Sequence, residues 1–280
     1  MRDQEWTEVI APKKGLFDIN FAELWRYRDL VYTFIQRDFV ARNKNTILGP
    51  LWLFLGPLFT VFSYTFVFSR IANISTDGIP GPLFYLAGTT LWGYFSSCFG
   101  GTAGTFTSNA GIFGKVYFPR LVTPISVVIS NLFKFFLQML MFLVFWVYYY
   151  KQGLAKMNSY ALLFPYLVLL MAMMGLGIGI LVSSLTTKYR DLNYFVGFGI
   201  TLLMYVSPII YPTSAIPAAY KSYLFLNPIA PIIEAFRYGF TGAGTVSWEG
   251  LAYSSVFSLF VLSMGAIVFN QVEKTFMDTV

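Results

Sequence analysis

The amino-acid sequence predicts an all-α integral membrane protein, and three observations support this. Of the 280 residues, 56% are hydrophobic and only 11% are charged, with a mean hydropathy of +0.62, whereas a soluble domain carries about 25% charged residues. Six apolar segments each approach the roughly 20 residues that an α-helix needs to cross a bilayer. A further apolar stretch, residues 207–239, is interrupted by five prolines.

Residues 1–46 form a predicted cytoplasmic and interfacial segment that is rich in charge. Within it, apolar side chains recur at helical spacing opposite polar ones, which predicts an amphipathic helix lying in the membrane interface. Such a helix anchors the chain to the membrane surface or docks a cytoplasmic partner, and the pattern leaves both readings open. The apolar positions are Leu24, Tyr27, Val31, Phe34 and Ile35.

The six predicted membrane helices follow this segment and make up one transmembrane domain, residues 47–270. Lys115 and Lys188 lie in loops on the side of the basic N-terminus, and the positive-inside rule assigns that side to the cytoplasm. Six crossings then return a short tail, residues 271–280, to the cytoplasm. We expect the helices at 47–70, 83–106, 121–148, 160–185, 193–212 and 250–270.

The stretch SPIIYPTSAIPAAYKSYLFLNPIAPIIEAFRYG at 207–239 is apolar but cannot form a spanning helix. Proline removes a backbone hydrogen bond and clashes with the preceding turn, and broken backbone at membrane depth needs protein or water around it. We therefore expect short re-entrant helices at about 213–240, forming an extracytoplasmic gate in which Glu234 and Arg237 are a structural pair. The gate residues are Pro208, Tyr211, Pro212, Pro217, Asn227, Pro228, Pro231, Glu234 and Arg237.

Two glycine pairs predict close helix packing. Gly100 and Gly104, and Gly175 and Gly179, have the small-xxx-small spacing that lets membrane helices approach one another. We expect these contacts to lie within one subunit.

Several kinds of chemistry lack the residues that they require. No Asp or Glu lies in the core of the six segments, so proton coupling lacks its usual relays. Histidine is absent and Cys98 is the one cysteine, which excludes the His and Cys zinc sites. Gly114-Lys115 fails as a phosphate-binding loop because Asn109 and Val116 stand where glycine and Ser or Thr are needed. We expect no catalytic residue, metal or cofactor in this chain, and its net charge of +6 gives no reason to expect nucleic acid.

A conduit through the membrane has one charged and several aromatic candidates. Lys134 lies near the middle of the third segment, where a charge must face protein or water; packing against a polar neighbour is favoured over lining an anionic path. Most aromatic side chains within segments should face lipid or other helices, and a minority would offer flat faces to sugar rings. The aromatic channel candidates are Phe62, Tyr64, Phe66, Phe68, Phe195, Phe198 and Tyr205.

Taken together, the segments resemble the membrane subunit of type-2 ABC exporters for polysaccharides. The matching stretches are LWRYRDLVYTFIQRDFVARNKNTILGPLW at 24–52, GKVYFPRLVTP at 114–124, and SPIIYP followed by NPIAPIIEAFRYG within 207–239. The resemblance implies an inner-membrane homodimer, bound to two copies of an ATPase that uses ATP and Mg. It also implies that ATP binding and hydrolysis move the first and fifth helices of the two copies, and that the sugar chain of a lipid-linked polymer threads a channel at the dimer interface.

The resemblance further implies that the N-terminal helix and the loop after the second helix contact the ATPase. The implied coupling residues are Arg26, Tyr27, Arg28, Asp29, Arg37, Asp38, Lys115, Tyr117, Phe118, Pro119 and Arg120.

Lipopolysaccharide O-antigen is the first expected substrate, and teichoic acid or a capsular polymer is the alternative. A drug or lipid exporter of the same family, a membrane enzyme acting on lipid-linked sugars and an ion-coupled carrier are the other readings. The enzyme is disfavoured because Asp191 and Glu234 are too sparse for acid–base or metal chemistry. The ion-coupled carrier is disfavoured by the missing intramembrane carboxylates.

Overall fold

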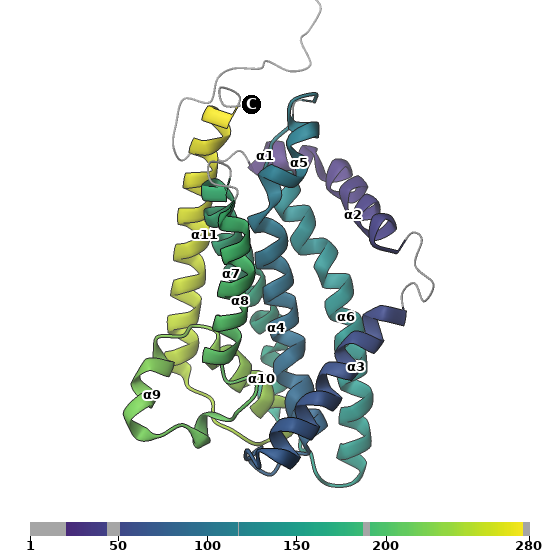
Figure 1. Ribbon diagram of the computed structural model, residues 1–280, viewed down its shortest axis with the longest axis vertical. Helices are drawn as coiled ribbons and strands as arrows, with labels where there is room; N and C mark the ends of the chain where they lie inside the picture. Colours follow the sequence, from purple (N-terminus) through teal and green to yellow (C-terminus); the bar gives the residue numbers. More distant parts are fainter. Residues whose placement is uncertain (1–20, 44–50, 117, 187–190, 277–280) are drawn as a thin grey trace, which may run out of the picture.

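The computed structural model describes residues 21–43, 51–116, 118–186 and 191–276, and its regular elements there are all helices (Figure 1). The expectations for residues 1–20 and 44–46, for Tyr117 and for residues 277–280 lie outside these ranges. The helices are α1 (Phe21–Arg26), α2 (Arg28–Asn43), α3 (Trp52–Tyr64), η2 (Thr65–Ile71), α4 (Gly81–Ala103), α5 (Thr105–Phe113), α6 (Val122–Lys151), η3 (Ser159–Leu163), α7 (Phe164–Thr186), α8 (Leu192–Val206), η4 (Thr213–Ala215), α9 (Ala218–Phe225), α10 (Ala230–Thr241) and α11 (Trp248–Phe276).

Each of the six predicted long segments contains a helix, and two predicted ends are wrong by several residues. The helix expected at 250–270 continues to Phe276. The helix expected at 193–212 ends at Val206, because Ser207 is extended and Pro208 follows it. Proline disfavours the α conformation in the residue before it. Four stretches of the described chain are long and apolar enough to cross a membrane: Trp52–Ile71, Val122–Lys151, Ser159–Thr186 and Trp248–Val272.

The two other long helices differ from these four in hydropathy or in length. The apolar part of α8 is Tyr194–Val206, which is shorter than a crossing requires. Helix α4 has 23 residues and carries Gly, Ser and Thr between its apolar side chains. It is buried against α6 and α7, where a hydroxyl such as that of Thr102 can donate to the Cys98 carbonyl at 2.7 Å. A helix enclosed by other helices needs less hydropathy than one that faces lipid.

The predicted glycine contacts occur on α7. A Cβ on Gly175 would lie 2.8 Å from Cys98 Cβ, and one on Gly179 would overlap Thr102 of α4. On the other side of α7, a Cβ on Gly177 would lie 2.7 Å from the Leu262 nitrogen of α11. Glycine therefore sets the α4–α7 and α7–α11 distances within one subunit. Gly100 and Gly104 make no comparably close approach to another helix.

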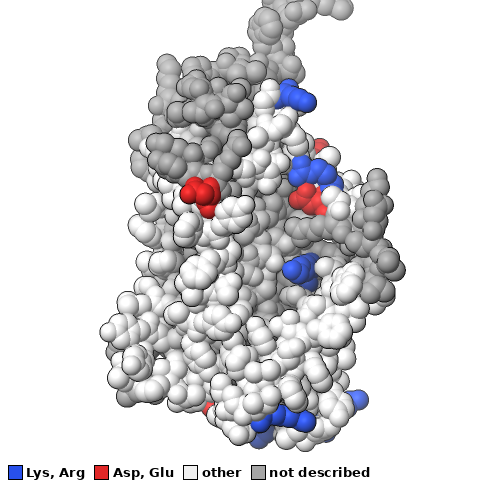
Figure 2. Space-filling view, in the orientation of Figure 1, with Lys and Arg blue, Asp and Glu red and all other residues white. Residues whose placement is uncertain are grey.

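The proline-rich stretch forms two short α-helices, α9 and α10, and the shorter η4 before them, as its broken pattern predicts. Pro217 is the N-cap of α9, and Pro231 stands in the first turn of α10, where the missing N–H has no intrahelical partner to lose. Helices α9 and α10 lie at one end of the long helices, and α1, α2 and α5 lie at the other (Figure 1). Between these ends, the face in Figure 2 shows few charged side chains among the described residues.

Candidate functional site

One predicted functional region is the junction between α2 and the turn joining α5 to α6. Phe34 of α2 is buried there, with its ring centroid 5.7 Å from that of Phe118. The Arg37 guanidinium lies 4.6 Å over the Phe34 ring and donates to Asn109 Oδ1 at 3.3 Å. Arg37 also pairs with Asp38 at 2.8 Å. Apolar packing and a polar link thus join α2 to α5 and the α5–α6 turn.

The same junction extends to the C-terminal helix. Phe106 of α5 stacks on Phe269 of α11 at 4.6 Å, and Phe113 packs against both Phe106 and Phe118. Ile180 of α7 belongs to the same buried cluster. We call the set Phe34, Phe106, Phe113, Phe118, Val122, Ile180 and Phe269 the junction cluster. Sequence reasoning missed Phe106, Phe113 and Phe269, because no local pattern connects positions so far apart.

The predicted coupling residues divide by burial. Phe118, Pro119 and Arg120 are buried, and the Arg120 guanidinium lies 5.4 Å over the Phe113 ring. These three therefore pack inside the chain, next to the surface rather than on it. Tyr27 and Asp38 are half-buried. The exposed members are Arg26, Arg28, Asp29, Arg37 and Lys115.

The channel candidates also divide into two groups. Tyr64 and Phe68 pack against Tyr85 of α4 with ring centroids 5.9 and 6.5 Å apart, and the Tyr64 hydroxyl donates to Met204 Sδ of α8 at 3.7 Å. They join α3 and η2 to α4 and α8 within the subunit. The other aromatic candidates are exposed on α3, η2 or α8, and these are Phe62, Phe66, Phe195, Phe198 and Tyr205.

Lys134 lies half-buried on α6 beside α4, and its Nζ donates to Ser97 Oγ at 3.4 Å. The amide oxygen of Gln138, one turn further along α6, lies near Gly93 of α4. This polar neighbourhood fits the packing role favoured from the sequence. Its role in a path for an anionic substrate stays a prediction.

The predicted gate region is anchored by a buried ion pair. Glu234 Oε1 accepts from Arg237 Nη1 at 2.8 Å, and Arg237 is only 1% exposed. Arg237 Nη2 donates to the Pro208 carbonyl at 2.8 Å, and its guanidinium lies 3.8 Å over the Phe84 ring of α4. The ion pair expected between these two residues is present, and Arg237 also ties α10 to the segment after α8 and to α4.

A second polar contact closes the loop that carries α9. Asn227 Nδ2 donates to Ser207 Oγ at 2.9 Å, so the two ends of the 207–227 segment meet. Between them Tyr211 and Pro212 lie near the end of α8, and the side chains of Tyr220 and Tyr223 on α9 are exposed. Helix α9 is therefore an exposed flap on a loop whose base is fixed.

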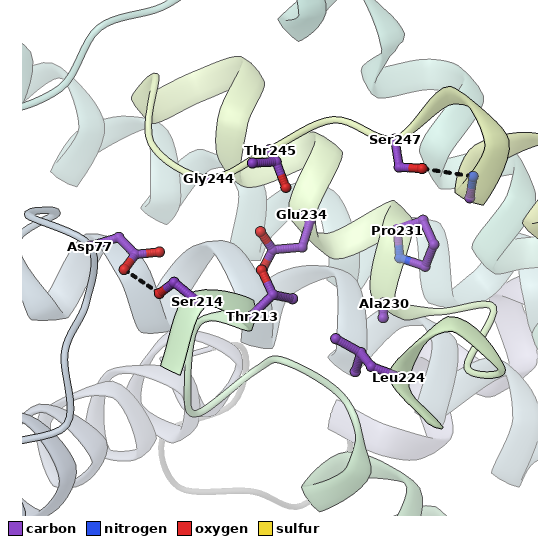
Figure 3. Close-up of a pocket in the computed structure, with 11 residues that line it drawn as sticks. Asp77, Thr213, Ser214, Leu224, Ala230, Pro231, Glu234, Gly244, Thr245 and Ser247 are labelled. Atoms are coloured by element: carbon purple, nitrogen blue, oxygen red, sulfur yellow. Dashed lines mark hydrogen bonds between the residues drawn. The ribbon is translucent and has the colours of Figure 1, made fainter. Parts of the chain in front are cut away.

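A cavity of 450 Å³ lies beneath this flap, and Figure 3 shows its walls. Ser214 lies on η4, in the same loop that carries α9, and donates to Asp77 Oδ1 at 2.6 Å. This hydrogen bond links that loop to the one between η2 and α4. Glu234 and Thr213 also line the cavity. Burial raises the pKa of Glu234 above its usual range, and the Arg237 guanidinium opposes that rise. Sequence reasoning missed Asp77 and Ser214 because 137 positions separate them.

Comparison with known proteins matches most of the chain. The family described as ABC-2 type transporter matches residues 29–241. An O-antigen export system permease protein RfbA of Myxococcus xanthus is 28% identical over 92% of this chain and 98% of that protein. One from Klebsiella pneumoniae is 28% identical over 89% of this chain and 94% of its own length. The polysialic acid transport protein KpsM of Escherichia coli is 24% identical over 87% and 93%.

Proposed function

This chain belongs to the ABC-2 type transporter family. We propose that it is the permease of an ATP-driven exporter of a lipid-linked polysaccharide, with O-antigen as the first candidate substrate. The proposal rests on similarity to two O-antigen export permeases, which covers nearly the full length of this chain and of each of those proteins. Members of this family are transport subunits, so the chain is not itself a catalytic enzyme. Similarity to KpsM favours polysialic acid as the second candidate polysaccharide.

The proposed complex contains two copies of this chain in the inner membrane and two copies of a separate ATPase that binds ATP and Mg. The apolar helices fit a membrane permease, and we propose six crossings. Five are formed by α3 with η2, α4, α6, α7 and α11, and the sixth by α8 together with the apolar residues 207–211 that follow it. Both termini then face the cytoplasm, together with α1, α2 and the α5–α6 turn. Helices α9 and α10 face the other side.

The proposed ATPase contact uses the exposed side chains next to the junction cluster. Arg28 and Lys115 are exposed at this end of the molecule, whereas Phe118 and Arg120 support the surface from within. A close-packed interior transmits displacement rather than absorbing it. Because the junction cluster joins α2 and α5 to α7 and α11, movement of the ATPase would shift these helices together.

The proposed polymer path lies between two copies, along the exposed face of α8. Phe195, Phe198 and Tyr205 present aromatic rings there, and flat apolar rings can support sugar rings without binding them tightly. The flap carrying α9 would cover the outer end. Its fixed base and exposed helix support a gate that moves without unfolding α10.

A genetic complementation experiment tests this function. Deleting the chain in its host should remove the polymer from the cell surface and cause the lipid-linked polymer to accumulate at the inner membrane. Plasmid-borne wild-type chain should restore export, as measured by gel analysis of surface glycolipid and by extraction of the lipid-linked intermediate. Unchanged surface polymer, with loss of export of a drug or simple lipid instead, would favour the other exporter class of this family.

A further inference from the structure

An apolar groove of 580 Å³ runs along one side of α3 and η2. Its α3 wall carries Leu55, Phe59 and Phe62, and Phe66 of η2 continues the same stripe at spacings of three or four residues. Such a stripe lies on one face of a helix. Phe145 of α6 and Pro82 of α4 contribute to the lining. The groove therefore lies between elements of one subunit and does not require a second copy to form it.

The groove has a cation at one end. Arg70 of η2 lines it and is exposed, and no hydrogen bond or ion pair joins its guanidinium to any residue that the structure describes. Every other groove residue is apolar except Thr65, whose hydroxyl donates to the Val61 carbonyl at 2.8 Å. The arrangement is a long apolar surface that ends in one available guanidinium.

The dimensions of the groove suit one chain of a lipid. Fifteen positions separate Leu55 from Arg70, which corresponds to about 22 Å along a helix at 1.5 Å per residue. The hydrocarbon core of a bilayer is about 30 Å thick, so one leaflet contributes about half of it. An acyl chain of one leaflet therefore fits alongside the stripe when its headgroup lies beside Arg70.

We propose that this groove binds an anionic phospholipid, with an acyl chain along the phenylalanine stripe and the phosphate on Arg70. Guanidinium groups bind phosphate oxygens through two parallel hydrogen bonds. Phosphatidylcholine carries a cationic group that partly neutralises its own phosphate, whereas phosphatidylglycerol carries none. The phosphate of phosphatidylglycerol should therefore attract the Arg70 guanidinium more strongly. Helix η2, which carries Arg70, packs beside Gly81 at the start of α4, and Arg237 of α10 lies over Phe84 in the same part of α4. The lipid therefore belongs to the leaflet on the side of α10.

Native mass spectrometry of the full chain in mild detergent tests the proposal, with phosphatidylglycerol and phosphatidylcholine as titrants. We expect one tightly held phosphatidylglycerol per chain and weaker binding of phosphatidylcholine. Arg70→Gln should weaken phosphatidylglycerol binding about tenfold, the usual size of a lost charge-assisted contact, and Arg70→Lys should weaken it less. Lys151→Gln is the matched control, because Lys151 is exposed at the same end but does not line the groove.

Three outcomes would overturn the lipid site. Equal binding of both lipids, or unchanged phosphatidylglycerol binding in Arg70→Gln, would show that Arg70 does not bind the headgroup through its charge. Phe62→Cys separately tests whether a second copy fills the groove: rapid disulfide formation between copies in native membranes would assign the surface to the dimer. Wild-type chain is the control for that arm, because its Cys98 is buried. Slow or absent cross-linking, together with the charge dependence, supports the lipid.

Discussion

Replacing Arg237 with Met should destabilise the gate region more than any exposed substitution on α9. Arg237 is buried and makes three contacts: an ion pair with Glu234, a hydrogen bond to the Pro208 carbonyl and a ring contact with Phe84. Methionine occupies part of the same volume but supplies neither charge nor donors. The Glu234 carboxylate then stays buried without its cation.

The size of the effect follows from which partner is removed. Removing one member of a buried ion pair typically costs about 3–5 kcal/mol, because the other charge is left uncompensated. Glu234→Gln should reduce the free energy of unfolding by less, about 1–3 kcal/mol. An amide oxygen can still accept a hydrogen bond from Arg237, and Arg237 retains its hydrogen bond to the Pro208 carbonyl and its contact with the Phe84 ring. The double variant Glu234→Gln with Arg237→Met leaves no buried charge, so it should cost less than the sum of the two single changes.

Denaturant unfolding in mixed micelles measures these free energies through a double-mutant cycle. The pH dependence of Arg237→Met supplies a second reading. Burial already raises the pKa of Glu234, and loss of the guanidinium raises it further. The folded variant then binds a proton that the unfolded chain has released, so its stability should fall as pH rises from the unfolded pKa, near 4.5, to the raised folded pKa.

The wild-type chain should show a weaker pH dependence, because Arg237 opposes the rise in the Glu234 pKa. Additive single effects, within about 0.5 kcal/mol, would contradict the argument, because contacting groups in one network should couple by more than this. A variant whose stability rises with pH over the same interval would also contradict it.

Three further predictions concern packing, coupling and the gate. Gly179→Leu should lower the free energy of unfolding by at least about 1–3 kcal/mol through overpacking, since its Cβ would overlap Thr102. Gly197→Leu is the control, because nothing lies within 4 Å of a Cβ built there. Equal unfolding midpoints for the two variants would refute the close approach at Gly179. Arg28→Glu should reduce co-purification of the ATPase without affecting membrane insertion, and unchanged co-purification would contradict docking on this surface. Deleting residues 218–231 should block polymer export or leave the membrane leaky to small solutes, whereas normal export and a tight membrane would exclude the gate.

Much of the helix pattern could be predicted from the sequence, because it depends on local properties. Apolar length predicts the long helices, and prolines mark the starts of α9 and α10. The polar and apolar sides of α2 follow from helical spacing, and Phe34 is the buried member of that pattern. The glycine spacing predicted close packing at Gly175 and Gly179 but did not identify α4 as the partner helix. It also did not predict the contact of Gly177 with α11, because Gly177 has no glycine partner at the required spacing.

Burial of individual functional candidates could not be predicted in the same way. Phe118 and Arg120 have the composition of a docking loop, yet both are inside the chain. Tyr64 and Phe68 have the composition of a channel wall, yet they pack on Tyr85. In each case the deciding neighbours lie on another helix, and the crossing of two helices is not encoded in the spacing within either one.

By itself, the sequence determined a membrane-embedded helical chain and its breaks, and it predicted that a separate subunit supplies the energy. These follow from hydropathy, from the backbone limits of proline and from the residues that are missing. Only the tertiary structure decided that Arg237 bridges α10, Pro208 and Phe84, and that Ser214 reaches Asp77. The physical reason is that a hydrogen bond or ring contact depends on distance in space, and folding brings together atoms that lie tens or hundreds of positions apart.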